Sequence, residues 1–187
     1  MANRNTQGFG LIPAGTLGQT PATAGLSKYK IDAGYATTIY NGGAVASNAG
    51  YIIDGQTTDA PIIGVLNGIF YNAATTLKPT FANFYKQPIT PANSEDVDAF
   101  VFDNPQQQNV VATDDAVAQS GYLETYDMNT SAGSDTTGKS SATLDIGDTS
   151  ADAAAFRLLR SAEDPENDEN AAFRSVVVCL NLIELQS

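Results

Sequence analysis

The stretch Pro61-Ile-Ile-Gly-Val-Leu-Asn-Gly-Ile-Phe-Tyr71 decides the fold of this chain. Its apolar residues follow one another directly, so a strand built from them would be covered on both faces and should be a central strand. Gly64 and Gly68 within it indicate bulges or a close approach of another backbone. A second apolar run, Val176–Leu182, is expected to lie deep in a sheet for the same reason.

Short runs of β-forming residues alternate with turn signals on both sides of this stretch. They recur about every ten residues, which is typical of sandwiches and barrels. Asn41-Gly42 and Ser47–Gly50 indicate turns, and Asp114 is placed to cap a short helix over Asp115–Ser120. The sequence therefore predicts a mainly β domain, either a β-barrel or β-tulip-like domain or a sandwich. The further strand candidates are Tyr29–Asp32, Tyr35–Tyr40, Ala44–Ala46, Tyr51–Asp54, Phe81–Gln87, Asp98–Asp103, Asn109–Thr113, Ser140–Ile146, Phe156–Arg160 and Phe173–Leu185.

Residues 1–28 form a distinct segment, MANRNTQGFGLIPAGTLGQTPATAGLSK. Its glycines and prolines break both helical and alternating periodicity, yet it contains more apolar side chains than a solvated linker. We therefore expect an extended N-terminal docking arm over residues 1–28, attached to a β-rich globular domain over residues 29–187. The alternative is a flexible tail with chance hydrophobic residues. The residues expected to bind a partner are Phe9, Leu11, Ile12, Leu17 and Leu26.

Composition argues against most enzymatic classes. The chain has no histidine, which removes the commonest general base and the commonest metal ligand. The single cysteine, Cys179, excludes an intrachain disulfide. The net charge of −12 is concentrated in residues 91–187, and such an acidic surface repels nucleic acid and anionic membranes. Met1–Phe9 has no apolar core of a signal peptide, and no stretch approaches the length of a membrane span.

Two sequence matches suggest chemistry, and neither fits its physical requirements. Gly133–Ser140 matches the P-loop pattern, but phosphate binding needs a buried strand before the loop and a helix after it. Asp164–Asn170 has oxygen-bearing side chains like a calcium loop, but Glu169 replaces the required glycine and Ser175 the final glutamate. A solvated, charged turn is the expected reading of that loop. No catalytic, cofactor-binding or metal-binding residue is assigned.

Six segments along the chain point to one family, namely residues 1–18, 28–40, 62–72, 87–105, 138–146 and 161–168. Together they resemble a small structural protein encoded in tailed-phage genomes, including marine ones. Separately, the hairpin followed by Gly-Val-Leu at residues 41–66 is similar to lambda-type head decoration proteins. That family implies a β-tulip seated on the threefold axes of the capsid, an N-terminal arm pinned to the shell, and no catalytic residues.

The sequence analysis therefore predicts a non-enzymatic capsid decoration, or cement, protein. Its expected partner is the major capsid protein, and it should act as a homo-oligomer, with a trimer favoured and a dimer possible. It should assemble in the host cytoplasm and reside on the outer capsid surface of the virion, without a cofactor, nucleic acid or membrane. The alternatives are another virion part (a head–tail joining or tail protein), a nucleotide-binding enzyme using Lys139, and a calcium-dependent adhesion module using Asp164–Asp168.

Overall fold

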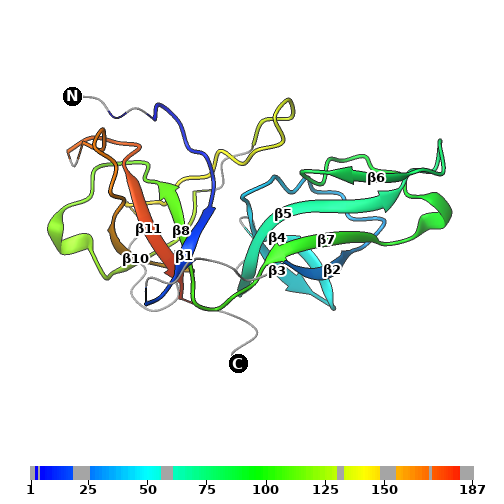
Figure 1. Ribbon diagram of the computed structural model, residues 1–187, viewed down its shortest axis with the longest axis horizontal. Helices are drawn as coiled ribbons and strands as arrows, with labels where there is room; N and C mark the ends of the chain where they lie inside the picture. The colour runs from blue at the N-terminus through cyan, green and yellow to red at the C-terminus, as the bar shows by residue number, and fades with distance from the viewer. Residues whose placement is uncertain are drawn as a thin grey trace.

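The computed structural model describes residues 3, 5–18, 26–55, 61–129, 133–147, 155–168 and 170–181. These residues form two antiparallel sheets that lie side by side along the long axis of the molecule (Figure 1). Among them no α-helix occurs, and short 3-10 turns lie at Ala92–Ser94 and Gln119–Gly121. The predicted mainly β class is confirmed. Neither sheet closes into a barrel, so the architecture is consistent with a sandwich.

The larger sheet is built from residues 27–102, and the fold-deciding stretch lies at its centre, as predicted. Its path runs β2–β7–β5–β3–β4, and β6 pairs with the far end of β5. The turn at Asn48–Tyr51 joins β3 to β4, with Ala49 and Gly50 at positive φ, so the predicted turn over Ser47–Gly50 is confirmed. The strands are β2 (Ser27–Ile31), β7 (Val97–Phe102), β5 (Ile62–Asn72), β3 (Ala44–Asn48), β4 (Tyr51–Asp54) and β6 (Pro79–Ala82).

The smaller sheet combines the beginning of the chain with its second half. Its order is β1–β8–β11–β10–β9. Every residue of β11 is buried, because strands pair with both of its edges and apolar side chains extend from both of its faces. The predicted deep strand over Val176–Leu182 is therefore confirmed for its described part. The strands are β1 (Ile12–Thr16), β8 (Gln107–Ala112), β11 (Ser175–Leu180), β10 (Phe156–Ser161) and β9 (Thr125–Tyr126).

Two hydrophobic cores explain why the central stretch is apolar on successive residues. The inter-sheet core joins the two sheets, and Val65 of β5 contributes to it together with Leu158 and Val178 of the smaller sheet. The second core lies on the opposite face of the larger sheet and contains Leu66, the next residue along β5. Because neighbouring strand residues point to opposite faces, β5 supplies both cores at once. The second core also includes Ile31, Ile39, Val45, Ile69, Tyr85 and Val101.

The N-terminal segment corrects the predicted arm. Residues 3 and 5–18 lie on the chain's own domain, and Ile12–Thr16 forms β1 at the end of the smaller sheet. Leu11 is only 1% exposed in the inter-sheet core, and its backbone N–H donates to the Gly42 carbonyl at 2.8 Å. A Cβ on Gly8 would lie 2.1 Å from the Ser141 carbonyl oxygen. Glycine is thus required here for close packing, whereas the sequence suggested flexibility. Residues 19–25 lie outside the described residues.

Three other predicted elements differ in the structure. Within Tyr35–Tyr40 no strand forms, and only Ile39 makes an isolated bridge, to Tyr85. The predicted helix over Asp115–Ser120 is absent, because the Asp114 carboxylate accepts a hydrogen bond from the Ile146 N–H at 2.9 Å and caps no helix. Ser140–Ile146 is extended but bridges several different segments, so it joins no sheet as a regular strand.

The buried polar side chain of Asn109 yields a stability prediction. Asn109 lies opposite Val178 on the core-facing side of β8 and is fully buried, and neither its amide nitrogen nor its carbonyl oxygen has a hydrogen-bond partner in the described residues. An unsatisfied buried polar group costs about 1–3 kcal/mol, so Asn109→Val should raise the free energy of unfolding by about 1 kcal/mol or more. Urea denaturation measures this change.

Asn109→Asp serves as the matched control, because it keeps the shape of the side chain and adds an unpaired charge. It should lower the free energy of unfolding. If Asn109→Val is as destabilising as Asn109→Asp, the amide is satisfied in solution and the unsatisfied arrangement is refuted.

Candidate functional site

Strand β1 presents an open edge of the smaller sheet (Figure 1). One of its edges pairs with β8 from Ile12 opposite Val110 to Thr16 opposite Gln107, and among the described residues no strand pairs with the other edge. The register shifts between Pro13 and Gly15, where one extra residue bulges. An added strand from a partner binds an open edge through backbone donors and acceptors. At this edge Pro13 supplies no N–H, and the Gly15 carbonyl already accepts from the Gln107 side-chain amide at 2.7 Å.

Apolar side chains accompany this edge. Ile12 is 51% exposed, and Leu17, directly after β1, is 43% exposed. Ile12 lies opposite Val110, which lies opposite Val177, so the three side chains share the face that points away from the inter-sheet core. We call the outer edge of β1 together with Ile12, Leu17 and Val110 the edge surface. It offers backbone hydrogen bonds and apolar contact area in one place.

The edge surface is held in place by hydrogen bonds of β1 itself and of the residues before and after it in the chain. The Leu17 N–H donates to the Gln106 carbonyl at 2.9 Å, and the Gln107 side-chain amide donates to the Gly15 carbonyl at 2.7 Å. Upstream of β1, the Asn3 side-chain amide donates to the Ala172 carbonyl at 2.8 Å. The strand is therefore pre-formed, and a partner would lose little entropy in ordering it.

The five residues expected to bind a partner have different positions. Ile12 and Leu17 are exposed at the edge surface, and Phe9 is half-buried. Leu11 is in the inter-sheet core, so its assignment to partner binding is corrected. Leu26 is 38% exposed but precedes β2 of the larger sheet, on another element. The sequence did not single out three other exposed apolar side chains, which are Leu77, Phe81 and Leu123.

The P-loop match at residues 133–140 is a tight hairpin. Gly133 bridges Ser140, the Gly138 N–H donates to the Ser134 carbonyl at 2.6 Å, and no helix follows in residues 140–147. The hairpin lies against the larger sheet's connecting segments, where the Tyr40 hydroxyl donates to Asp135 at 2.8 Å. This hydrogen bond, with the Lys86 ammonium nearby, lowers the pKa of Asp135. The match therefore lacks the strand–loop–helix geometry that phosphate binding requires.

The acidic loop after β10 uses its polar groups internally. The Asn167 side-chain amide donates to the Ser175 carbonyl at 2.8 Å, and the Asp164 carboxylate accepts from the Glu166 N–H at 3.0 Å. The Asn3 side chain accepts a hydrogen bond from the Asp168 N–H, so the loop anchors the N-terminal segment. Over the described ranges, no cluster of three or more His, Cys, Asp or Glu side chains is arranged to hold a metal ion.

Two further findings concern the whole chain. The part of the chain that the structure describes contains no helix of the length and hydrophobicity needed to cross a membrane. Comparisons with models of known protein families, with curated proteins and with solved structures gave no match.

Proposed function

We propose that this protein is a virion structural protein that decorates a phage capsid and binds through the edge surface. The observation that carries the proposal is the open edge of β1 with Ile12 and Leu17 exposed beside it. The resemblance of several segments to tailed-phage structural proteins supports it from the sequence. In this proposal the partner is the major capsid protein, and the protein sits on the outer capsid surface as a homo-oligomer, with a trimer favoured.

The proposed mechanism is mechanical. A strand of a capsid subunit adds to β1, so that its backbone groups pair and Ile12 and Leu17 become buried. Complete burial of such a side chain contributes about 1.5–3 kcal/mol. A homo-oligomer multiplies this contact through avidity. By binding the assembled shell across the seams between its subunits, the protein stabilises it against separation.

The test removes the apolar part of the edge surface. The double variant Ile12→Asp with Leu17→Asp should stay folded with only a small drop in melting temperature, because about half of each side chain is already in solvent. It should bind undecorated capsids at least about tenfold more weakly in co-sedimentation, because it loses the burial of two apolar side chains and adds charge to the contact.

Leu123→Asp is the matched control, because Leu123 is 65% exposed and lies outside the edge surface. It should bind capsids like the wild type. A double variant that still saturates capsids at the wild-type concentration would assign docking to another surface or refute the capsid role. Binding to isolated tails in place of capsids would identify the protein as a tail component.

A further inference from the structure

Aromatic side chains gather on the face of the larger sheet that points away from the second core. Phe70 of β5 lies opposite Phe81 of β6, and Gly68 lies opposite Phe100 of β7, so the three phenylalanines share one face. The rings of Phe81 and Phe100 are 6.0 Å apart and tilted. Phe81 is 63% exposed. This aromatic face lies on a different sheet from the edge surface.

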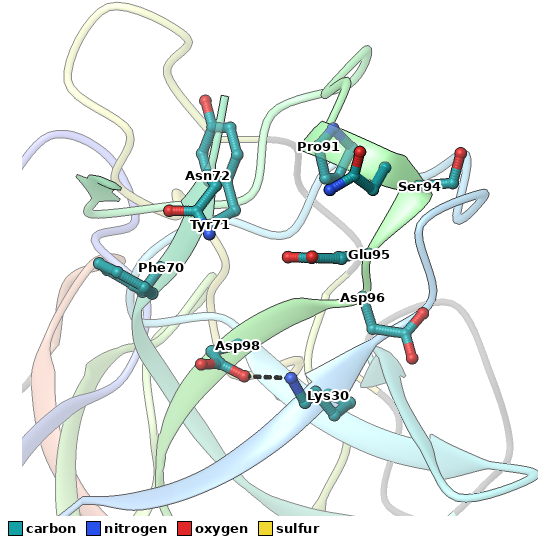
Figure 2. Close-up of a pocket in the computed structure, with 10 residues that line it drawn as sticks. Lys30, Phe70, Tyr71, Asn72, Pro91, Ser94, Glu95, Asp96 and Asp98 are labelled. Carbon is teal, nitrogen blue, oxygen red and sulfur yellow. Dashed lines mark ion pairs between the residues drawn. The ribbon is translucent and has the colours of Figure 1, made fainter. Parts of the chain in front are cut away.

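A cavity of about 450 Å³ adjoins this face and shares Phe70 as a wall (Figure 2). Its other lining residues come from the end of β5, from the turn that begins at Pro91, and from β2 and β7. Figure 2 shows the Glu95 side chain directed into the cavity and the Lys30–Asp98 ion pair along one side. Apolar and charged groups therefore meet in one concave site.

The cavity has an excess of negative charge. Lys30 is the only basic residue among those described that line it, and its ammonium lies 2.6 Å from Asp98. Burial raises the pKa of Asp98, but its hydrogen bonds with Lys30 and Lys28 outweigh this, so the net pKa is lowered and the carboxylate is ionised. Asp96 accepts a hydrogen bond from the Tyr51 hydroxyl at 3.3 Å.

The Glu95 carboxylate has no hydrogen bond or close ion pair within the ranges that the structure describes, and its residue is exposed. The hydrogen bond to Asp98 is the main cause that raises the pKa of Lys30, and the charge of Glu95 adds to it. Asp98 pairs with two ammonium groups, those of Lys30 and Lys28. Against the three carboxylates of Glu95, Asp96 and Asp98 they leave one negative charge in excess, which makes the cavity complementary to a single cationic group. A metal ion does not fit, because the described residues here hold no cluster of metal-ligating side chains. The phenylalanine wall favours an organic cation that can lie against a ring.

We propose that this cavity binds an arginine side chain of a partner protein. The guanidinium pairs with Glu95, for which its flat fork of donors is suited, and its plane lies against Phe70. An apolar neighbour of that arginine packs on Phe81 and Phe100. The site goes beyond the proposed capsid contact, since it lies on the other sheet and depends on no property of a capsid.

The test is an NMR titration of the full chain with N-acetyl-arginine amide. Amide shifts should change at residues 70–72 and 93–98, with saturation in the millimolar range expected for one side chain. N-acetyl-citrulline amide, which has the same shape without the charge, should bind about tenfold more weakly. Glu95→Gln should weaken arginine binding by a similar factor, and Phe70→Leu should weaken it by a smaller one.

Glu163→Gln, in the exposed acidic loop, is the matched control and should leave the titration unchanged. Equal binding of the citrulline compound, or insensitivity to Glu95→Gln, would overturn the proposal. Shifts confined to residues 163–168 would show attraction to acidic surface only. N-acetyl-leucine amide giving the same shifts would show an apolar site. None of these outcomes involves capsids, so this inference and the proposed function fail independently.

Discussion

Deletion of residues 2–16 is expected to abolish the cooperative unfolding transition of the smaller sheet. The deletion removes β1, the buried side chain of Leu11 and the hydrogen bonds of Asn3 to the loop before β11. Losing a buried leucine side chain alone costs about 2–5 kcal/mol, which is a large part of the roughly 5–15 kcal/mol that stabilises a domain. Calorimetry and near-ultraviolet circular dichroism measure the transition.

Two point variants compare the contributions of a buried and an exposed side chain of this segment to the free energy of unfolding. Leu11→Ala should lower the free energy of unfolding by about 2–5 kcal/mol. Ile12→Ala, at the next position, should lower it by less than about 1 kcal/mol, because half of that side chain is already in solvent. If the deletion leaves the melting curve unchanged, the segment is a separate arm after all and its packing on the domain is refuted.

Val178→Asp is expected to prevent stable folding. Val178 is fully buried at the centre of β11 in the inter-sheet core, where a carboxylate would have no charged partner. Burying an unpaired charge is among the few single changes that exceed about 4–5 kcal/mol. Val65→Asp should have the same effect from the larger sheet, since it contributes to the same core. Soluble yield and thermal melting measure both variants.

Val110→Asp is the control for this pair. Val110 lies on the strand next to β11 but points away from the core and is only half-buried, so its substitution should leave the chain folded. A soluble Val178→Asp protein with the wild-type melting temperature would place the core elsewhere.

The buried strands β5 and β11 were predictable, because a strand that is covered on both faces consists of successive apolar residues. Residues that alternate between two cores, such as Val65 and Leu66, are apolar in succession whatever the register. The N-terminal segment was not predictable in this way. A glycine such as Gly8 is compatible both with a flexible tail and with a close contact between backbones. Only the position of the Ser141 carbonyl in the fold shows that the contact is the reason for this glycine.

Site residues were harder to predict, because their exposure depends on strand pairing. Leu11 and Ile12 are adjacent apolar residues, and only the register of β1 on β8 makes one a core residue and the other a surface residue. The cavity was missed for the same reason. Phe70, Glu95 and Lys30 lie on three segments that are separated in sequence, and no local pattern relates them.

The place of β1 in the smaller sheet has a consequence for the order of folding during synthesis. The larger sheet is complete once residues 27–102 have left the ribosome, because all its strands fall within that range. β1 cannot pair until β8 emerges, and the Asn3 amide reaches a partner 169 residues later in the chain. Contacts of such long sequence separation form slowly. Although β1 is synthesised before the larger sheet, it is thus among the last elements to reach its native position. Until then the inter-sheet face of the nascent larger sheet stays open to solvent.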